Sequence, residues 1–186
     1  NGFSIPVAQC IGANDKKNLR VYISNMTWLS IAFSLIMTVV VSVFCKDILE
    51  LMKTPTDIID NAYDYIIIIF IGIPVTYLYN VLSGIMRALG DSKLPLIFLI
   101  ISSVINVVLD LVTILIFDMG VKGPALATVV AQLISGVLCF ITIIKKYDVV
   151  RVQKGEWGFG RIHAVNLCRM GIPVGLQYSI TAIGSV

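Results

Sequence analysis

Charge is scarce in this sequence. Only 13% of its 186 residues are Asp, Glu, Lys or Arg, whereas 58% are hydrophobic. Soluble domains carry about 25% charged residues, so this composition excludes a soluble globular domain, whose surface needs more charge. The few charges gather in short clusters between long uncharged stretches. The net charge of +3 therefore does not indicate nucleic-acid binding, and we expect no nucleic-acid partner.

Residues that carry enzyme chemistry are also scarce. The one histidine, His163, lies in a basic loop, and no nucleophile–base pair, phosphate-binding loop or metal-ligand cluster is visible. The four cysteines, Cys10, Cys45, Cys139 and Cys168, have no C-x-x-C or metal-binding spacing. They are typical of small packing residues in a membrane protein without structural disulfides. We expect no enzyme activity, no resident metal and no cofactor.

Long apolar runs dominate instead. Runs of about 20 apolar residues match the hydrocarbon thickness of a bilayer, and four are complete, at 21–44, 60–86, 94–117 and 124–144. Partial runs lie at both ends, and the missing initial Met favours an internal piece of a longer protein. Backbone groups in lipid must pair within their own segment, which requires helices. The sequence predicts an all-α membrane protein, a bundle of transmembrane helices with a kink at Pro74.

The polar connections predict the orientation in the membrane. We expect loops at 12–20, 46–57, 87–93, 118–123 and 145–163. Eleven Lys and Arg residues accompany the first, third and fifth loops, and three accompany the others. Positively charged loops stay in the cytoplasm, so we expect loops 12–20, 87–93 and 145–163 to be cytoplasmic in a bacterial inner membrane.

Run 94–117 contains a polar stripe. Ser103, Asn106, Asp110 and Thr113 follow one another at offsets of three, four and three, which places them on one helix face. Asp110 lies about 10 Å from the outer end, where a carboxylate costs about 2.5–3.5 kcal/mol. It either faces a wet cavity or binds a cation, which would be a functional role, or it forms a hydrogen bond to a neighbouring helix for packing alone. The cost favours the functional interpretation.

Run 124–144 carries a matching stripe of Thr128, Gln132 and Ser135. The short turn before it predicts an antiparallel hairpin with run 94–117. Counted from that turn, Thr128 and Gln132 bracket the depth of Asp110, so a polar pocket between the helices is possible. Taken alone, Thr128 and Gln132 are more typical of interhelical hydrogen bonding.

Run 60–86 carries a third stripe of Thr76, Asn80 and Ser83, which Arg87 continues directly after the run. Tyr63 and Tyr65 lie near the expected outer end of this run. The residues alone favour the aromatic belt of a membrane interface for both tyrosines.

Several motifs resemble those of the multidrug and toxic compound extrusion (MATE) family. They are Pro6-Val-Ala-Gln9, Gly84-Ile-Met-Arg-Ala-Leu-Gly-Asp91 with Pro95, Asn106-Val-Val-Leu-Asp110 and Gly123-Pro-Ala-Leu-Ala-Thr128. Their order and spacing match along the whole chain. The resemblance implies twelve helices in two lobes, with residues 1–163 forming the N-terminal lobe from the end of helix 2 through helix 6. Residues 164–186 would begin helix 7.

The resemblance also implies a function and a site. The family exports cationic or amphipathic toxic compounds in exchange for Na⁺ or H⁺. In one branch a cation site combines a helix 1 Asp, which lies outside this chain, with residues that match Asn106, Asp110 and Thr128. A tyrosine near that site matches Tyr65, and Gln132 and Asn80 are further candidates to line it.

We therefore expect a secondary antiporter of small cationic or amphipathic molecules, embedded in lipid and without an obligate protein partner. Na⁺ or H⁺ would be the coupling ion, with transient Na⁺ at Asp110. The same superfamily contains flippases for lipid-linked oligosaccharides, which is the alternative function. A membrane enzyme would need a catalytic cluster, which is not visible. A structural subunit would not need Asn106, Asp110 and Thr128 together in an apolar hairpin.

Overall fold

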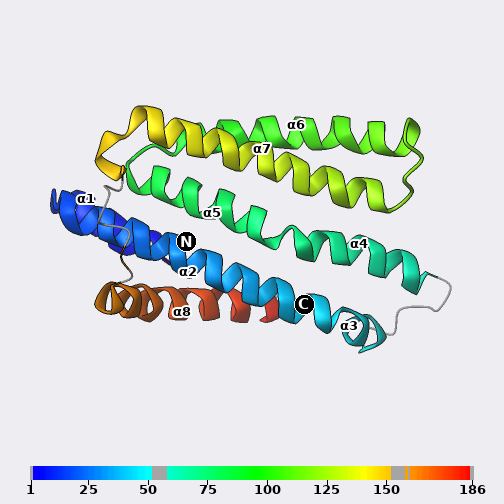
Figure 1. The fold of residues 1–186 in the computed structure, drawn as a ribbon, viewed down its shortest axis with the longest axis horizontal. Helices are drawn as coiled ribbons and strands as arrows, with labels where there is room; N and C mark the ends of the chain where they lie inside the picture. The colour runs from blue at the N-terminus through cyan, green and yellow to red at the C-terminus, as the bar shows by residue number, and fades with distance from the viewer. Residues whose placement is uncertain (1, 52–57, 152–157, 159, 185–186) are drawn as a thin grey trace. The chain divides into compact units, whose positions relative to one another are not determined.

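The computed structural model describes residues 2–51, 58–151, 158 and 160–184, and every regular element within them is a helix (Figure 1). The elements are α1 (Ser4–Gly12), α2 (Lys16–Val43), α3 (Cys45–Leu51), α4 (Ile59–Ile71), α5 (Ile73–Ala88), α6 (Lys93–Leu115), α7 (Lys122–Lys146), the short 3₁₀ helix η1 (Asp148–Val150) and α8 (Arg161–Gly184). The all-α prediction is confirmed.

The long helices match the predicted spans. Helices α2, α6 and α7 are each long and apolar enough to cross a bilayer. Helices α4 and α5 pass the same test together, as one broken span with a bend of 40°. These four correspond to the runs predicted at 21–44, 94–117, 124–144 and 60–86. The protein is a multi-pass membrane protein.

The break between α4 and α5 lies at Gly72, two residues before the proline that predicted a kink. Pro74 has no N–H to donate, so the i to i−4 ladder cannot continue through it. The Gly72 amide still bonds to the carbonyl of Ile68 at 3.0 Å, and the Val75 amide turns back to the Gly72 carbonyl at 3.0 Å. The predicted kink is confirmed, and Pro74 itself sits in the first turn of α5, where proline is tolerated.

Helices extend into predicted loops 12–20, 46–57 and 145–163, which corrects the bounds of these loops. Loop 12–20 ends early because Asp15 caps α2: its carboxylate accepts the Asn18 amide at 3.1 Å and the Asn18 side chain at 2.6 Å. These hydrogen bonds lower the pKa of Asp15. Loop 46–57 begins as α3, which buries Cys45 and Leu49. Residues 52–57 lie outside the described part of the chain.

Contacts divide the chain into two compact units. Unit 1 comprises Asn1–Ser30, Asn80–Pro95 and Cys139–Val186, and unit 2 comprises Ile31–Tyr79 and Leu96–Leu138.

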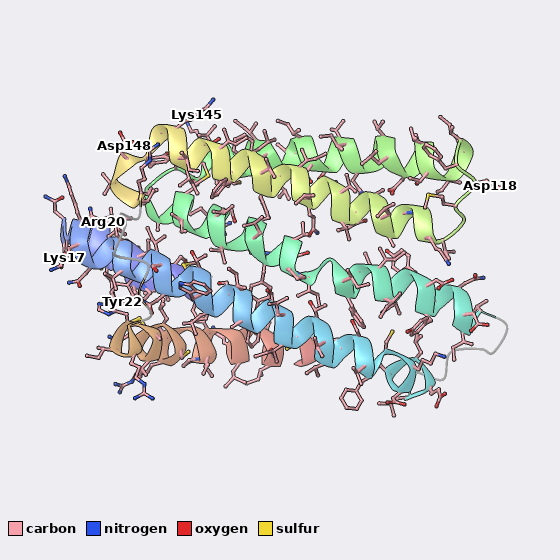
Figure 2. The ribbon with its side chains drawn as sticks, viewed as in Figure 1. Lys17, Arg20, Tyr22, Asp118, Lys145 and Asp148 are labelled. Carbon is pink, nitrogen blue, oxygen red and sulfur yellow. The ribbon has the colours of Figure 1, made fainter. Side chains whose placement is uncertain are left out.

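Unit 1 has an apolar interior and one charged end. Its fully buried side chains include Val7, Leu19, Met86, Cys139 and Leu167. Figure 2 shows the charged side chains of unit 1 that it labels at one end of the unit: Lys17, Arg20, Lys145 and Asp148. These four charges, from predicted loops 12–20 and 145–163, therefore share one end of this unit, as two loops on the same side of a membrane require.

Unit 2 contains the predicted hairpin. Helices α6 and α7 lie side by side (Figure 1), joined by a turn in which Asp118 and Gly120 adopt φ of 48° and 54°. The Ser102 hydroxyl donates to the carbonyl of Ala131 at 2.8 Å, and the Ser135 hydroxyl to that of Phe98 at 3.1 Å. Hydroxyl-to-carbonyl bonds of this kind join helices in lipid. The antiparallel hairpin is confirmed.

Helix α6 is apolar around most of its remaining surface. Its exposed large side chains are Leu96, Ile97, Leu99, Ile100, Ile101, Val104, Val107, Val108, Leu111, Ile114 and Leu115. An exposed apolar helix of this length is suited to a lipid environment.

Candidate functional site

The candidate site lies within the α6–α7 hairpin. The side-chain amide of Asn106 donates to the Thr128 hydroxyl oxygen across the two helices, at 3.3 Å. Thr128 directs its own hydroxyl proton to the carbonyl of Pro124, 2.9 Å away and one turn earlier on α7. Thr128 therefore acts as an acceptor toward α6. The structure joins two of the three residues that the resemblance assigns to a cation site.

Asp110 lies one turn beyond Asn106 on the same face of α6. Its Oδ1 atom is buried and has no hydrogen-bond partner among the described residues. The nearby Thr113 hydroxyl donates at 3.1 Å to the backbone carbonyl of Asp110, so it does not satisfy the carboxyl group. A buried polar atom without a partner is costly. A proton or a cation on the Asp110 carboxylate would relieve this cost.

The oxygens near Asp110 suit a hard cation. Carboxylate and amide carbonyl oxygens are ligands that Na⁺, like other hard cations, accepts. Asn106 uses an N–H on Thr128, so its carbonyl oxygen can serve as a ligand. The arrangement can therefore exchange ions without covalent chemistry.

The register of the hairpin corrects the predicted depth of two residues. Successive hydrogen-bonded pairs are Phe98 with Ser135, Ser102 with Ala131, and Asn106 with Thr128. One further turn outward along α6 places Asp110 at the level of Pro124. Thr128 and Gln132 therefore lie on the same side of Asp110, farther from the turn, and do not bracket it. The turn lies two residues earlier than predicted, because α6 ends at Leu115 and α7 starts at Lys122.

The predicted stripe on α6 also needs a correction. Ser103 is exposed, whereas its neighbour Ser102 is buried and faces α7 through its bond to Ala131. The polar residues of α6 that face the hairpin are Ser102, Asn106, Asp110 and Thr113, the last of which is buried against Gly123 of α7.

The other predicted lining residues take different positions. Gln132 accepts a hydrogen bond from the Thr76 hydroxyl of α5, a partner 56 residues away. Tyr65 on α4 is 39% exposed, and within the described residues it forms no hydrogen bond with Asn106, Asp110 or Thr128. Asn80 belongs to unit 1, where its backbone carbonyl accepts the Ser83 hydroxyl at 3.1 Å.

A second polar cluster lies in unit 1 and was not predicted. Asp91 accepts the Leu94 amide at 3.1 Å and thereby caps α6. Its other oxygen accepts Lys146 and Tyr147, each at 2.8 Å. These hydrogen bonds, first of all that of Lys146, lower the pKa of Asp91 to about 2. The cluster joins the turn after α5 to the end of α7.

A third cluster gives His163 the partners that the sequence did not indicate. The His163 ring packs edge-on against Tyr22, with centroids 4.8 Å apart, and its Nε2 lies 3.4 Å from Oδ1 of Asn18. Nearby, the fully buried Asn25 accepts the Gly160 amide at 2.9 Å. The cluster ties the first turns of α2 to the start of α8. Residues more than 130 positions apart leave no local signal of such contacts.

Comparison with known proteins agrees with this architecture. The sequence model of the MatE family matches residues 1–112. The chain is similar to "Probable multidrug resistance protein YpnP" of Bacillus subtilis, with 34% identity over 96% of the chain and 40% of the relative. It is also similar to "Probable multidrug resistance protein YoeA" of Bacillus subtilis, with 28% identity over 100% of the chain and 42% of the relative. The chain thus spans about two fifths of the length of these relatives.

The fold matches a solved structure. It is the "Crystal structure of MATE in the bent conformation", which aligns with a TM-score of 0.91 at 23% identity, over 98% of this chain and 41% of the other. At this identity the match shows the fold alone.

Proposed function

The chain belongs to the MatE family, and we propose that it works as the N-terminal lobe of a secondary antiporter. The antiporter exports cationic or amphipathic toxic compounds in exchange for Na⁺ or H⁺. Residues 1–163 would form this lobe, and residues 164–186 would start the second lobe. The two Bacillus subtilis relatives support an efflux role through their names. None of the reported relatives supports the flippase alternative.

The observation that carries the proposal is the unpartnered Oδ1 of Asp110 within the α6–α7 hairpin. In lipid this carboxyl group needs a proton or a cation. One turn away, Asn106 and Thr128 already form a polar contact between the two helices. Removing or adding an ion at Asp110 changes the charge of the hairpin interior. A transporter that rocks one lobe against the other around such a site would couple the ion to its substrate.

The residues of this chain have separate roles in that mechanism. Asp110 carries the charge that the ion neutralises. Asn106 offers its carbonyl oxygen to a bound cation while its N–H holds Thr128. Thr128 keeps α7 in register with α6. The substrate needs no covalent step, since the ion gradient supplies the free energy.

The test uses the full-length transporter in proteoliposomes with ethidium as substrate. An imposed Na⁺ or pH gradient should drive ethidium export by the wild-type protein. Asp110→Asn should abolish the gradient-driven part, because Asn keeps the shape but cannot take up a proton or balance a cation. Asp118→Asn is the matched control: it removes a carboxylate from the exposed turn after α6 and should export normally. If Asp110→Asn exports ethidium at the wild-type rate under the gradient, Asp110 is a packing residue without a role in coupling.

A further inference from the structure

Within unit 2, the broken span α4–α5 contacts α7 at several points along its length. At the start of α7, Lys122 pairs with Asp64 of α4 at 2.9 Å. Farther along, Val129 meets the break at Gly72, and Gln132 accepts the Thr76 hydroxyl. Gly136 then lies against Leu78 and the backbone of Tyr79. The two parts of the broken span are thus attached to α7 on both sides of the break.

At the break, the backbone of Gly72 lies directly against the side chain of Val129 on α7. A Cβ atom added to Gly72 would lie 2.4 Å from Cγ2 of Val129, a separation that real Cβ atoms do not show. Only glycine allows this approach. Next to it, the Gly72 carbonyl accepts the Val75 and Thr76 amides at 3.0 and 3.1 Å. The break between α4 and α5 therefore packs against Val129, the residue that follows Thr128.

The Thr76–Gln132 hydrogen bond adjoins the candidate site. Gln132 and Thr128 are four residues apart on α7, so they share one face of that helix. Thr128 contacts α6 and Gln132 contacts α5. A rotation of α7 about its axis that breaks one of these contacts strains the other. Helix α7 is in this way held from two sides at the depth of Thr128.

We propose that Thr76 and Gln132 are positioning residues of the coupling site, which hold the start of α5 against α7 and so keep Thr128 opposite Asn106. The inference rests on the proposed function and extends it to the α4–α5 break. When α5 moves about Gly72, the Thr76 hydrogen bond moves Gln132 with it and rotates α7. The rotation shifts Thr128 relative to Asn106 and so changes the site next to Asp110. Ion occupancy and the angle of α5 are then linked, since each favours one arrangement of α7.

The experiment titrates the ion dependence of ethidium export by the full-length transporter in proteoliposomes. NaCl is varied at fixed pH in one series, and pH is varied at fixed NaCl in another. Thr76→Val keeps the shape and removes the hydroxyl. Loss of a single neutral hydrogen bond changes an equilibrium constant by about three- to tenfold. We therefore expect the half-saturating concentration of the coupling ion to rise by that factor in Thr76→Val. Thr76→Ser keeps the hydroxyl and should restore the wild-type value.

Two further variants separate positioning from general packing. Gln132→Met removes the acceptor with little change in volume and should give the same shift as Thr76→Val. The double variant should shift no further, because both changes remove one bond. The matched control is Ser135→Ala, which removes another α7 hydrogen bond, to Phe98. It should lower thermal stability without changing the half-saturating ion concentration.

The outcomes distinguish this inference from the proposed function. If Thr76→Val and Gln132→Met keep the wild-type ion dependence, or if Ser135→Ala shifts it equally, Thr76 and Gln132 have no positioning role. In either case the loss of coupling in Asp110→Asn would still support the proposed function. If Asp110→Asn retains coupled export, the coupling site lies elsewhere and both proposals fail. Should Thr76→Val not insert into the membrane, Gln132→Met provides the same comparison.

Discussion

The side-chain amide of Asn106 and the hydroxyl of Thr128 lie 3.3 Å apart, across two helices and 22 positions of sequence. Thr128 gives its proton to the Pro124 carbonyl, which fixes the direction of the Asn106 contact. Asn106 is therefore the donor in this contact, and its carbonyl oxygen remains available as a ligand of the proposed cation. Under the proposed function, this contact gives a threonine and an asparagine, neither of which can carry the coupling charge, a role beside Asp110.

Thr128→Val tests this relationship. The change keeps the β-branched shape and removes the oxygen that accepts Asn106. We expect the half-saturating ion concentration for coupled export to rise about three- to tenfold, the value of one neutral hydrogen bond. Because Asp110 is intact, coupling itself should persist. Thr128→Ser should behave as wild type, and unchanged ion dependence in Thr128→Val would show that the hydroxyl has no part in the site.

Asp91 provides a pH-dependent prediction. Its pKa of about 2 in the folded protein lies below the ordinary value of 3.8, so it stabilises the fold above pH 4, and this contribution is lost as pH falls toward 2. Asp91→Asn should lower the free energy of unfolding at pH 7 by about 1 kcal/mol, a modest value because Lys146 is half exposed.

Chemical denaturation in detergent at several pH values measures this effect. The difference between wild type and Asp91→Asn should shrink between pH 4 and pH 2. The control is Asp148→Asn, since Asp148 is an exposed carboxylate with only a 3.9 Å contact to Arg151. A difference that is constant with pH would show that the Asp91 carboxylate charge is not what stabilises the turn.

Asn25 should be essential for the attachment of α8 to α2. It is fully buried, accepts the Gly160 amide at 2.9 Å and donates to the Val21 carbonyl at 2.8 Å. Asn25→Ala leaves the Gly160 amide without this acceptor, which costs about 1–3 kcal/mol. Limited proteolysis should then cleave before α8 faster than in wild type. Thr27→Ala, which removes a bond only within α2, is the control, and equal cleavage of both variants would contradict the prediction.

The membrane orientation remains a prediction and can be tested by labelling. Cys45 is buried and is therefore a poor reporter, so exposed positions are better. In a cysteine-free background, Asp118→Cys should react with a membrane-impermeant maleimide on intact cells, because it lies in the turn predicted to be outside. Lys17→Cys should react only after permeabilisation. The reverse pattern would invert the topology.

The sequence predicted the spans because their signals are local. Apolar runs of bilayer length indicated α2, α6, α7 and the pair α4–α5. The polar face of α6 at Asn106 and Asp110 followed from helical periodicity alone. Which of Ser102 and Ser103 faces α7 was not settled by periodicity, because adjacent residues differ by about 100° around the helix and the edge of a face depends on the neighbour.

Register and long-range pairing could not be predicted. The depth of Thr128 relative to Asp110 depends on the turn between α6 and α7, whose backbone passes through positive φ at Asp118 and Gly120. The Thr76–Gln132 contact joins residues 56 positions apart, and its direction depends on the break at Gly72. His163 lacked a visible partner for the same reason, since Tyr22 and Asn18 lie far away in sequence.

Ion displacement by substrate tests the central claim most directly. Tetraphenylphosphonium is titrated calorimetrically into the full-length transporter in detergent, in buffers of different ionisation enthalpy and at several NaCl concentrations. For wild type we predict release of about one proton per bound substrate, or an affinity that falls as NaCl rises, because substrate and ion compete for the charge of Asp110. Asp110→Asn should show neither effect, and Asp118→Asn should show the wild-type effect. Ion displacement that persists in Asp110→Asn would contradict the account.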